Sequence, residues 1–212
     1  DIVSSNVLQH MKYLEELTPF KILDTSKNDT SLVFAGRPPE IYNRKIRDPK
    51  GFLDLLCLFP VVNSYGLEVK IFAEIKQLDQ KLLKFENYRL IKPCHYKNFV
   101  KELALADYLF QISHEGEGFS QLIMQALTLR VKLLVNRRSL PEELLNIVEK
   151  KLNTNIPKEF YFSESKSNLI IFKDHLSGKM DNFHNKLFDA ALIYLEINQK
   201  EIYNLWQKLL NE

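Results

Sequence analysis

Residues 113–127 read SHEGEGFSQLIMQAL and follow Tyr108 to Ile112, an apolar run with the composition of a buried strand. Gly116 and Gly118 permit a tight turn, and the residues after them have the apolar spacing of a helix. The backbone amides of residues 119–121 would open that helix without partners of their own, an arrangement that attracts phosphate. The segment therefore predicts a strand, a turn and a helix, with an anion site at the turn.

On both sides of this segment, short β-rich runs alternate with longer stretches of helical spacing, as in βα units around a parallel sheet. The expected strands are Ser31–Gly36, Leu67–Ala73, Tyr88–Lys92, Tyr108–Ile112, Val131–Asn136 and Leu169–Phe172. The expected helices are 51–59, 77–85, 96–105, 119–130 and 141–152. We therefore predict an α/β fold over residues 31–178, with a doubly wound, Rossmann-like parallel sheet of about six strands.

The two ends of the chain have a different pattern. Residues 1–30 have the pattern of the trailing elements of a preceding domain followed by a polar linker. Residues 179–212 predict two helices, broken near Asn198, that pack back on the domain. Because the chain begins with Asp1 and not Met, we expect it to be a piece of a longer protein with an upstream domain.

Composition narrows the possible functions. The 212 residues are 45% hydrophobic, which is typical of a folded domain, and 29 Lys and Arg against 27 Asp and Glu give too weak a net charge to favour nucleic acid. Two cysteines, Cys57 and Cys94, exclude a disulfide framework and favour a reducing, cytoplasmic setting. The five histidines have no metal-site spacing with acids or cysteines, so no metal is expected. Any anion site must be local.

Five pieces of the sequence occur in an order found in a known family. They are Val33–Arg37 (VFAGR), Lys50–Leu56 (KGFLDLL), Leu103–Phe110 (LALADYLF), residues 113–127 and Val131–Val135 (VKLLV). Together they resemble the retaining, nucleotide-sugar-dependent glycosyltransferases of the GT-B architecture, in the group 1 or family four class. The resemblance implies that the chain holds the C-terminal, donor-binding domain of such an enzyme, with the active site facing a second domain.

The resemblance assigns the cations of the site. The family's Arg and Lys clamp the donor's pyrophosphate, and here they correspond to Arg37 and Lys50. Two cations at that place would stabilise the charge that develops on the leaving nucleoside diphosphate. Residues 38–49 make this connection longer than the family's usual one. Three cations of this insertion are alternatives for the second position: Arg44, Lys45 and Arg47.

The resemblance also assigns the contacts to the donor's sugar and nucleoside. Glu117 matches the glutamate near the sugar hydroxyls, with Glu115 as the alternative, and Gln125 stands where the family has the ribose-binding glutamate. An amide accepts the ribose hydrogen bonds more weakly than a carboxylate, by about 1 kcal/mol. The other donor-binding residues implied are Gly36, Gly118, Phe119, Ser120 and Gln121, with Cys94 and His95 beside the base.

The expected function is transfer of a hexose-type sugar from a UDP- or GDP-sugar, without a metal or other cofactor. The acceptor would be a glycan, a lipid-linked molecule or a protein in surface glycoconjugate synthesis, in the cytoplasm or at the inner face of the membrane. Three departures from the family pattern, at Gln125, Ser120 and Phe72–Ile75, favour an alternative. In that alternative the chain is a catalytically silent GT-B-like subunit that binds a partner or glycan and supports an active transferase.

Overall fold

The computed structural model describes residues 30–37, 39–42, 45–73, 87–92, 94–115, 120–162 and 168–211, without the side chains of residues 40–46 and 201–211. The elements expected before residue 30 and the helix expected at 77–85 lie outside this range. Five strands form one parallel sheet: β1 (Ser31–Ala35), β4 (Glu68–Phe72), β5 (Tyr88–Ile91), β6 (Tyr108–Gln111) and β7 (Lys132–Val135). All five lie where the sequence predicts strands.

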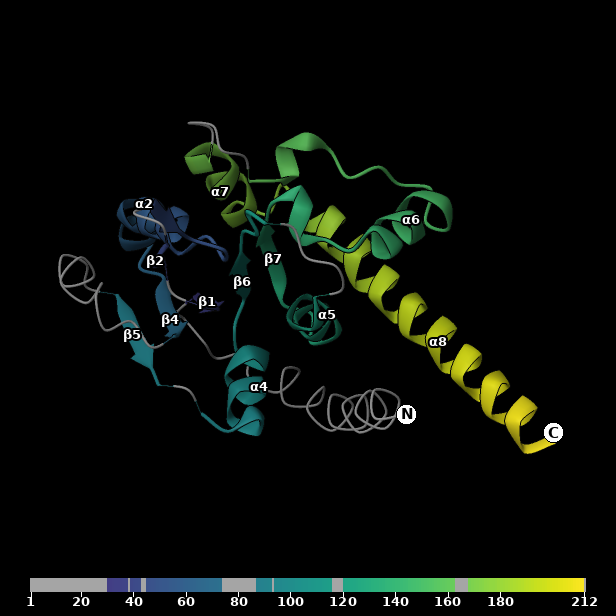
Figure 1. The fold of residues 1–212 in the computed structure, drawn as a ribbon. Coiled ribbons are helices and arrows are strands. Elements are labelled where there is room, and N and C mark those ends of the chain that lie inside the picture. The colour runs from purple at the N-terminus through teal and green to yellow at the C-terminus, as the bar shows by residue number, and fades with distance from the viewer. Residues whose placement is uncertain are drawn as a thin grey trace.

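The strand order is β5-β4-β1-β6-β7. The chain therefore builds the sheet outward from β1 in one direction, then returns to the other side of β1 with β6. This reversal makes the boundary between β1 and β6 the switch point of the sheet, where open α/β folds bind their ligands beyond the carboxyl ends of the strands. Figure 1 shows β1 and β6 at the middle of the sheet.

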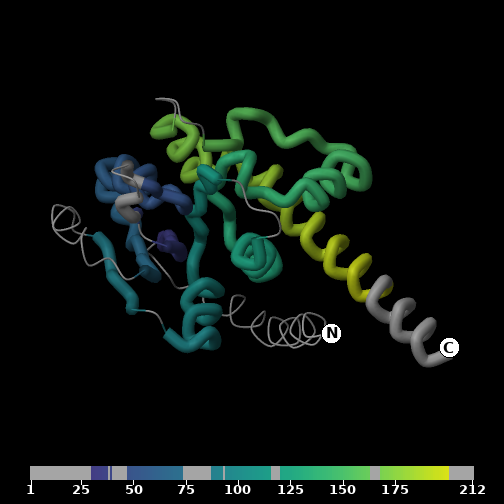
Figure 2. The backbone as a smooth tube through the Cα atoms, in the orientation of Figure 1, coloured from purple at the N-terminus to yellow at the C-terminus, as the bar shows by residue number. Residues whose placement is uncertain are grey.

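Helices cover both faces of the sheet (Figures 1 and 2). They are α2 (Phe52–Ser64), α4 (Tyr96–Ala104), α5 (Gln121–Thr128), α6 (Glu142–Lys150), α7 (Asn168–Leu176) and α8 (Asp181–Asn211). Side chains alternate between the faces along each strand. In β1, Leu32 and Phe34 pack in the core under α2 and α7, whereas Val33 packs in the core under α4, α5, α6 and α8. The fold is thus doubly wound, as predicted.

Two predictions about the C-terminal part are wrong. Leu169–Phe172, expected as a strand, belongs to α7, which packs against α2 with Ile171, Phe172 and His175 buried. A run of four apolar residues does not distinguish a strand from a helix, and packing decides between them. The two helices expected at the C-terminus are one continuous helix, α8. Asn198 lies inside it and donates a 2.8 Å hydrogen bond to the carbonyl of Tyr194, so it does not break the helix.

The insertion at 38–49 contains an element that the sequence did not predict. β2 (Glu40–Tyr42) and β3 (Lys45–Arg47) pair as an antiparallel hairpin between β1 and α2. The hairpin forms a separate sheet. In the described residues the parallel sheet therefore has five strands, whereas the sequence predicted about six. None of the helices in the described part of the chain is long and apolar enough to cross a membrane.

Candidate functional site

The candidate site lies at the carboxyl ends of β1 and β6, on either side of the switch point. The turn after β1 contains Gly36 and Arg37, and the segment after β6 contains Ser113, His114 and Glu115. Because β1 and β6 are paired neighbours in a parallel sheet, both segments leave the same edge of the sheet. Two pieces that are 76 residues apart in the sequence therefore meet at one place.

Lys50 is brought against the turn after β1. A Cβ atom added to Gly36 would lie 2.8 Å from Cβ of Lys50 and 2.9 Å from its Cγ, a separation that only glycine permits. The next residue, Gly51, has a φ of 73° and precedes α2, and a Cβ atom there would lie 2.9 Å from the carbonyl oxygen of Ile112. The two glycines therefore pack the start of α2 tightly between the ends of β1 and β6.

The charge of Arg37 acts on Lys50, the second cation predicted at the site. Lys50 is half-buried, and its pKa lies below the usual value because burial disfavours the charged amine and Arg37 repels it, while Glu115 opposes the shift. Arg37 is exposed at the end of β1. The structure thus places Lys50 beside Gly36, the residue before Arg37, and the roles that the resemblance implies for the two cations stay predictions.

Arg47 and Glu115 form an ion pair across the site. The Nε of Arg47 bonds one oxygen of Glu115, and Nη2 of Arg47 bonds the other at 2.7 Å. The hydrogen bond from Arg47 is the largest cause that holds the pKa of Glu115 below its usual value, and the charges of Arg37 and Lys50 add to it. Of the three alternatives in the insertion, Arg44 and the side chain of Lys45 lie outside the described part of the structure.

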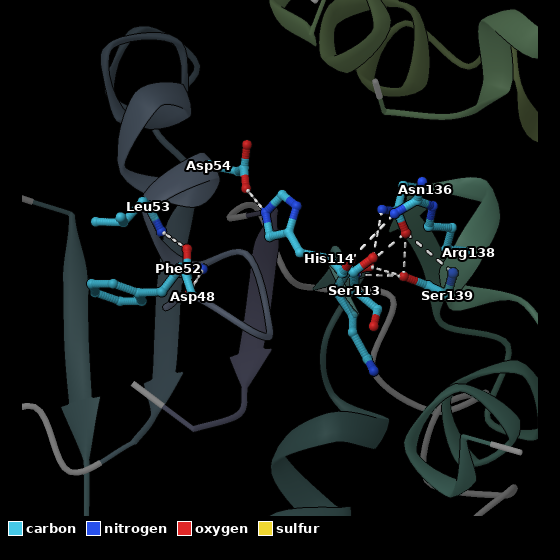
Figure 3. Close-up of polar contacts among 10 residues, drawn as sticks. Asp48, Phe52, Leu53, Asp54, Ser113, His114, Asn136, Arg138 and Ser139 are labelled. Atoms are coloured by element: carbon cyan, nitrogen blue, oxygen red, sulfur yellow. Dashed lines mark hydrogen bonds and ion pairs between the residues drawn. The ribbon is translucent and has the colours of Figure 1, made fainter. Parts of the chain in front are cut away.

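The base of the segment after β6 is anchored to the end of β7 (Figure 3). The Ser113 amide donates to Oγ of Ser139 at 2.9 Å, and the Asn136 side-chain amide donates to the Ser113 carbonyl at 2.9 Å. Ser139 Oγ in turn donates to the Gln111 carbonyl at 3.0 Å. Ser113 and Ser139 are fully buried, so this polar bracing fixes where the segment leaves the sheet.

A group of three metal-ligating residues lies beside the cations: Asp48, Asp54 and His114. One ligand atom of each lies within 4.8 Å of the others, so the set is able to hold a divalent ion. The structure also gives each residue another role. The carboxylate of Asp48 accepts the amides of Phe52 and Leu53 at 2.9 and 2.7 Å and caps α2, and Nε2 of His114 lies 2.7 Å from Asp54.

Burial is the largest cause that raises the pKa of Asp48, and the nearby charge of Asp54 raises it further, while the two amides of α2 oppose the shift. Spacing along the sequence did not indicate that His114 would lie near acids, and the expectation that the chain binds no metal stays a prediction. His114 is 60 residues from Asp54, and only the pairing of β1 with β6 brings α2 and the segment after β6 together. The sequence analysis missed Asp48, because the N-cap of α2 is Gly51 and Asp48 lies three residues before it, outside the usual capping position.

The helix after the glycine-rich turn, α5, begins at Gln121, two residues later than predicted. Ser120, which stands where the family has a glycine, is the N-cap of α5, and its Oγ accepts the Ile123 amide at 3.5 Å. Gln121 is exposed, whereas Gln125 is buried with 6% of its surface exposed. Glu117, Gly118 and Phe119 lie outside the described residues.

The two residues predicted beside the base are not brought to the switch point. Cys94 and His95 are exposed and follow β5, the outermost strand on its side of the sheet. β5 is two strands away from β1, which corresponds to roughly 10 Å at the usual strand spacing. A ligand that contacts both Lys50 and His95 would therefore extend along the carboxyl edge of the sheet.

Comparisons with known proteins find the fold but no sequence relative. No protein-family model and no curated protein sequence matches this chain. Among solved structures, a glycosyltransferase from Rickettsia africae aligns over 94% of this chain and 55% of its own, with 12% identity and a TM-score of 0.58. Anabaena HepE, solved with UDP-glucose, aligns over 91% of this chain and 53% of its own, with 11% identity and a TM-score of 0.57.

The pneumococcal O-GlcNAc transferase GtfA, solved with UDP and GlcNAc, aligns over 89% of this chain and 36% of its own, with 13% identity and a TM-score of 0.57. The chain therefore spans about a third to a half of the length of these structures. At this identity the likeness shows the fold alone. It confirms the predicted Rossmann-like fold, which this chain shares with one part of each of these glycosyltransferases.

Proposed function

We propose that this chain is the donor-binding part of a GT-B glycosyltransferase that transfers a hexose-type sugar from a nucleotide sugar. In this proposal the sugar is transferred to a glycan, a lipid-linked molecule or a protein during the synthesis of a surface glycoconjugate. The reaction takes place in the cytoplasm or at the inner face of the membrane. The observation that carries the proposal is the place of Lys50 beside Gly36, the residue before Arg37, at the switch point of the sheet. The folds of HepE and GtfA, solved with UDP-glucose and with UDP and GlcNAc, support UDP as the first nucleotide to test.

In this proposal Arg37 and Lys50 bind the diphosphate of the donor. As the bond between the sugar and the diphosphate breaks, negative charge develops on the leaving phosphate oxygen, and cations already in place stabilise it. The bound anion also favours the charged form of Lys50, which counters the effect of burial on its pKa. Because side chains supply this positive charge, we propose that transfer needs no metal ion.

Other residues complete the donor site in the proposal. Glu117 orients the sugar, and Gln125 hydrogen-bonds the ribose. Gly36 admits the diphosphate close to the backbone after β1. The remaining donor contacts are Gly118, Phe119, Ser120 and Gln121 at the start of α5 and Cys94 and His95 near the base.

Titration calorimetry of this chain with UDP and GDP, in the presence of EDTA, tests the proposal. Arg37→Ala and Lys50→Ala should each weaken binding about 10- to 100-fold, because each removes a charge-assisted hydrogen bond to phosphate. Arg89→Ala is the matched control, since Arg89 is an exposed arginine on β5 that pairs with Glu102 at 3.2 Å. Absence of binding to both nucleotides, or equal binding by all variants, contradicts the proposal, and binding lost on adding EDTA contradicts its metal independence.

A silent GT-B-like subunit is the second candidate. The observation that favours it is Gln125, an uncharged residue with only 6% of its surface exposed at the position of the family's ribose-binding carboxylate. Gln125→Glu distinguishes the two candidates. In a working donor site the variant should change UDP affinity several-fold, whereas a silent subunit should bind no UDP with either residue.

A further inference from the structure

His114 links two elements that meet at the switch point. Its backbone belongs to the segment after β6, and Nε2 of its ring donates a 2.7 Å hydrogen bond to Asp54 in the first turn of α2. Figure 3 shows the imidazole between Asp54 and the backbone of the segment. The side chains of Asp54 and His114 are 26% and 32% exposed, so this bond lies at the edge of the site and not in the core.

The backbone that carries the His114 ring is held from the other side, by the end of β7 (Figure 3). The guanidinium of Arg138 donates to the His114 carbonyl at 3.3 Å. Asn136 and Ser139 hold the carbonyl and the amide of Ser113, each at 2.9 Å. Because Ser113 is fully buried, these bonds leave the backbone before His114 little freedom to move. The ring of His114 therefore reaches across to α2 from a braced segment.

The start of α2 decides where Lys50 lies. Lys50 and Gly51 come directly before α2, and a Cβ atom on Gly51 would lie 2.9 Å from the carbonyl oxygen of Ile112. Such packing limits how far apart the two backbones lie, whereas a hydrogen bond also has a preferred direction. The bond from His114 reaches α2 at Asp54, about one helical turn beyond Gly51. Two contacts one turn apart fix both the place and the direction in which α2 begins.

We propose that Asp54 and His114 are positioning residues for the ligand of the switch point. Through their hydrogen bond the braced segment after β6 sets where α2 begins, and with it the place of Lys50 beside Gly36. A ligand that spans the ends of β1 and β6 then meets groups that are already in place, so its binding does not have to order them. The inference rests on the proposed function for the identity of that ligand as a nucleoside diphosphate.

The charge of Asp54 separates positioning from simple electrostatics. A carboxylate near a diphosphate site repels the ligand, so its removal should strengthen binding if charge were its only effect. Loss of positioning has the opposite sign, because the ligand then has to order the start of α2 when it binds. The direction in which Asp54→Ala changes the affinity therefore distinguishes the two effects.

The test is a double-mutant cycle with Asp54→Ala, His114→Ala and the double variant, titrated calorimetrically with UDP, GDP and inorganic pyrophosphate. Each single variant should weaken binding about five- to ten-fold. The double variant should lose little more than either, since both changes remove the same hydrogen bond. Asp54→Asn keeps an oxygen acceptor and His114→Gln keeps an N–H donor, so each should recover most of the affinity.

Two controls accompany the cycle. The midpoint of urea denaturation should shift little in every variant, because a pair this exposed contributes little to global stability. Glu142→Gln removes one negative charge from another exposed pair, with Arg137 at 3.0 Å. This variant should change the affinity for any of the three ligands less than two-fold.

The outcomes separate this inference from the proposed function. If the chain binds UDP but Asp54→Ala binds it equally well or more tightly, or if the two losses add fully, the positioning pair is overturned and the function stands. A loss of affinity matched by a large fall in stability also overturns the pair, because it shows a purely structural role. If pyrophosphate shows the coupled losses and no form binds UDP or GDP, the pair stands and the nucleotide-sugar function fails. Absence of binding to all three ligands overturns both.

Discussion

Two regions of the molecule hold histidines in close polar contact, and they treat charge in opposite ways. Behind β7, His175 and His184 are fully buried, and their rings contact Phe160. At the switch point, His114 lies beside Asp54 with 32% of its side chain exposed. The first region keeps its imidazoles neutral, whereas the second surrounds its imidazole with carboxylates and nearby cations that remain in contact with water.

The hydrogen bonds of the buried pair fix which ring nitrogens carry protons. The Leu133 amide donates to Nδ1 of His184 at 3.4 Å, so Nε2 of His184 carries the proton and donates to Nδ1 of His175 at 3.0 Å. Nε2 of His175 then donates to the Phe160 carbonyl at 2.9 Å. Each ring thus carries one proton, and protonating either ring a second time would break one of these hydrogen bonds. Burial, the largest cause, lowers the pKa of His175 to about 4 and that of His184 to about 2.

The comparison shows that, in these two regions, the fold keeps its polar groups neutral where they are buried and charged where water reaches them. A buried polar group is stable when every donor and acceptor is satisfied without ionisation, so it contributes to stability and is closed to ligands. The groups at the switch point are partly exposed and paired with one another, so they form their ion pairs in contact with water. The four predictions below test this division.

Acid should produce the largest effect, through the buried pair. The folded pKa values of His175 and His184 lie below the unfolded value near 6.5, so the unfolded chain binds more protons and stability falls as the pH drops below about 6.5. At pH 5 the loss should be about 2 kcal/mol for each imidazole, measured by urea denaturation against pH 7. His114→Gln should retain this slope, and an unfolding free energy that stays level over this range would contradict the neutral chain of hydrogen bonds.

Gly51→Ala should be the next largest change, and it acts on the switch point. The backbone of Gly51 has a positive φ, and an added Cβ atom would lie 2.6 Å from Cβ of Ile112. We therefore expect the free energy of unfolding to fall by about 3 kcal/mol and the binding of UDP beside Lys50 to weaken. Gly66→Ala is the matched control, because Gly66 has a φ of 65° but no atom within 4 Å of the added Cβ. That variant should lose only about 1 kcal/mol. Equal losses would mean that the packing of Gly51 on Ile112 is not tight.

Asp48→Ala should cost about 1 kcal/mol, the usual value of a helix cap, because two amides at the start of α2 lose their acceptor. Thermal denaturation should show a decrease of about 2 to 4 °C in Tm for a chain of this length. Asp48→Asn should recover most of the loss, since an asparagine oxygen also caps helices. If Asp48→Asn is as unstable as Asp48→Ala, the charge of Asp48 and not its capping bonds stabilises the start of α2.

His114→Gln should have the smallest effect on stability, below about 1 kcal/mol, because its pair with Asp54 is partly exposed. The same variant should retain the acid sensitivity of the buried pair. A loss of several kcal/mol from His114→Gln would show that the switch point is a structural centre like the His175–His184 pair, and the contrast between the two regions would fail.

Local patterns in the sequence were enough to predict much of the fold. All five strands of the sheet and the helices at α2, α4, α5 and α6 follow from apolar periodicity, since each buries one face or one stripe of its own residues. Periodicity failed at Leu169–Phe172 and at Asn198, where the choice depended on α7 packing against α2 and on α8 packing against α5 and α6. The β2–β3 hairpin was missed because each of its strands has only three residues.

The candidate site was only partly predictable. The motifs indicated Arg37 and Lys50, and the structure places Lys50 beside Gly36, the residue before Arg37. No local pattern indicated that Arg47 would pair with Glu115, or that Asp48, Asp54 and His114 would converge. Metal-binding and capping motifs are identified by the spacing of residues along the chain. That spacing carries no information about residues that meet only because two strands are neighbours in the sheet.

The sequence by itself therefore determined the succession of βα units and the two-sided core, because these depend on side chains that act within one element. The tertiary structure decided which charges face one another. It joined Arg47 to Glu115 across the end of β6, and it enclosed His175 and His184 where they stay neutral. The physical reason is that Coulomb interaction and desolvation depend on distance and burial in space, and both are set by strand order and helix packing.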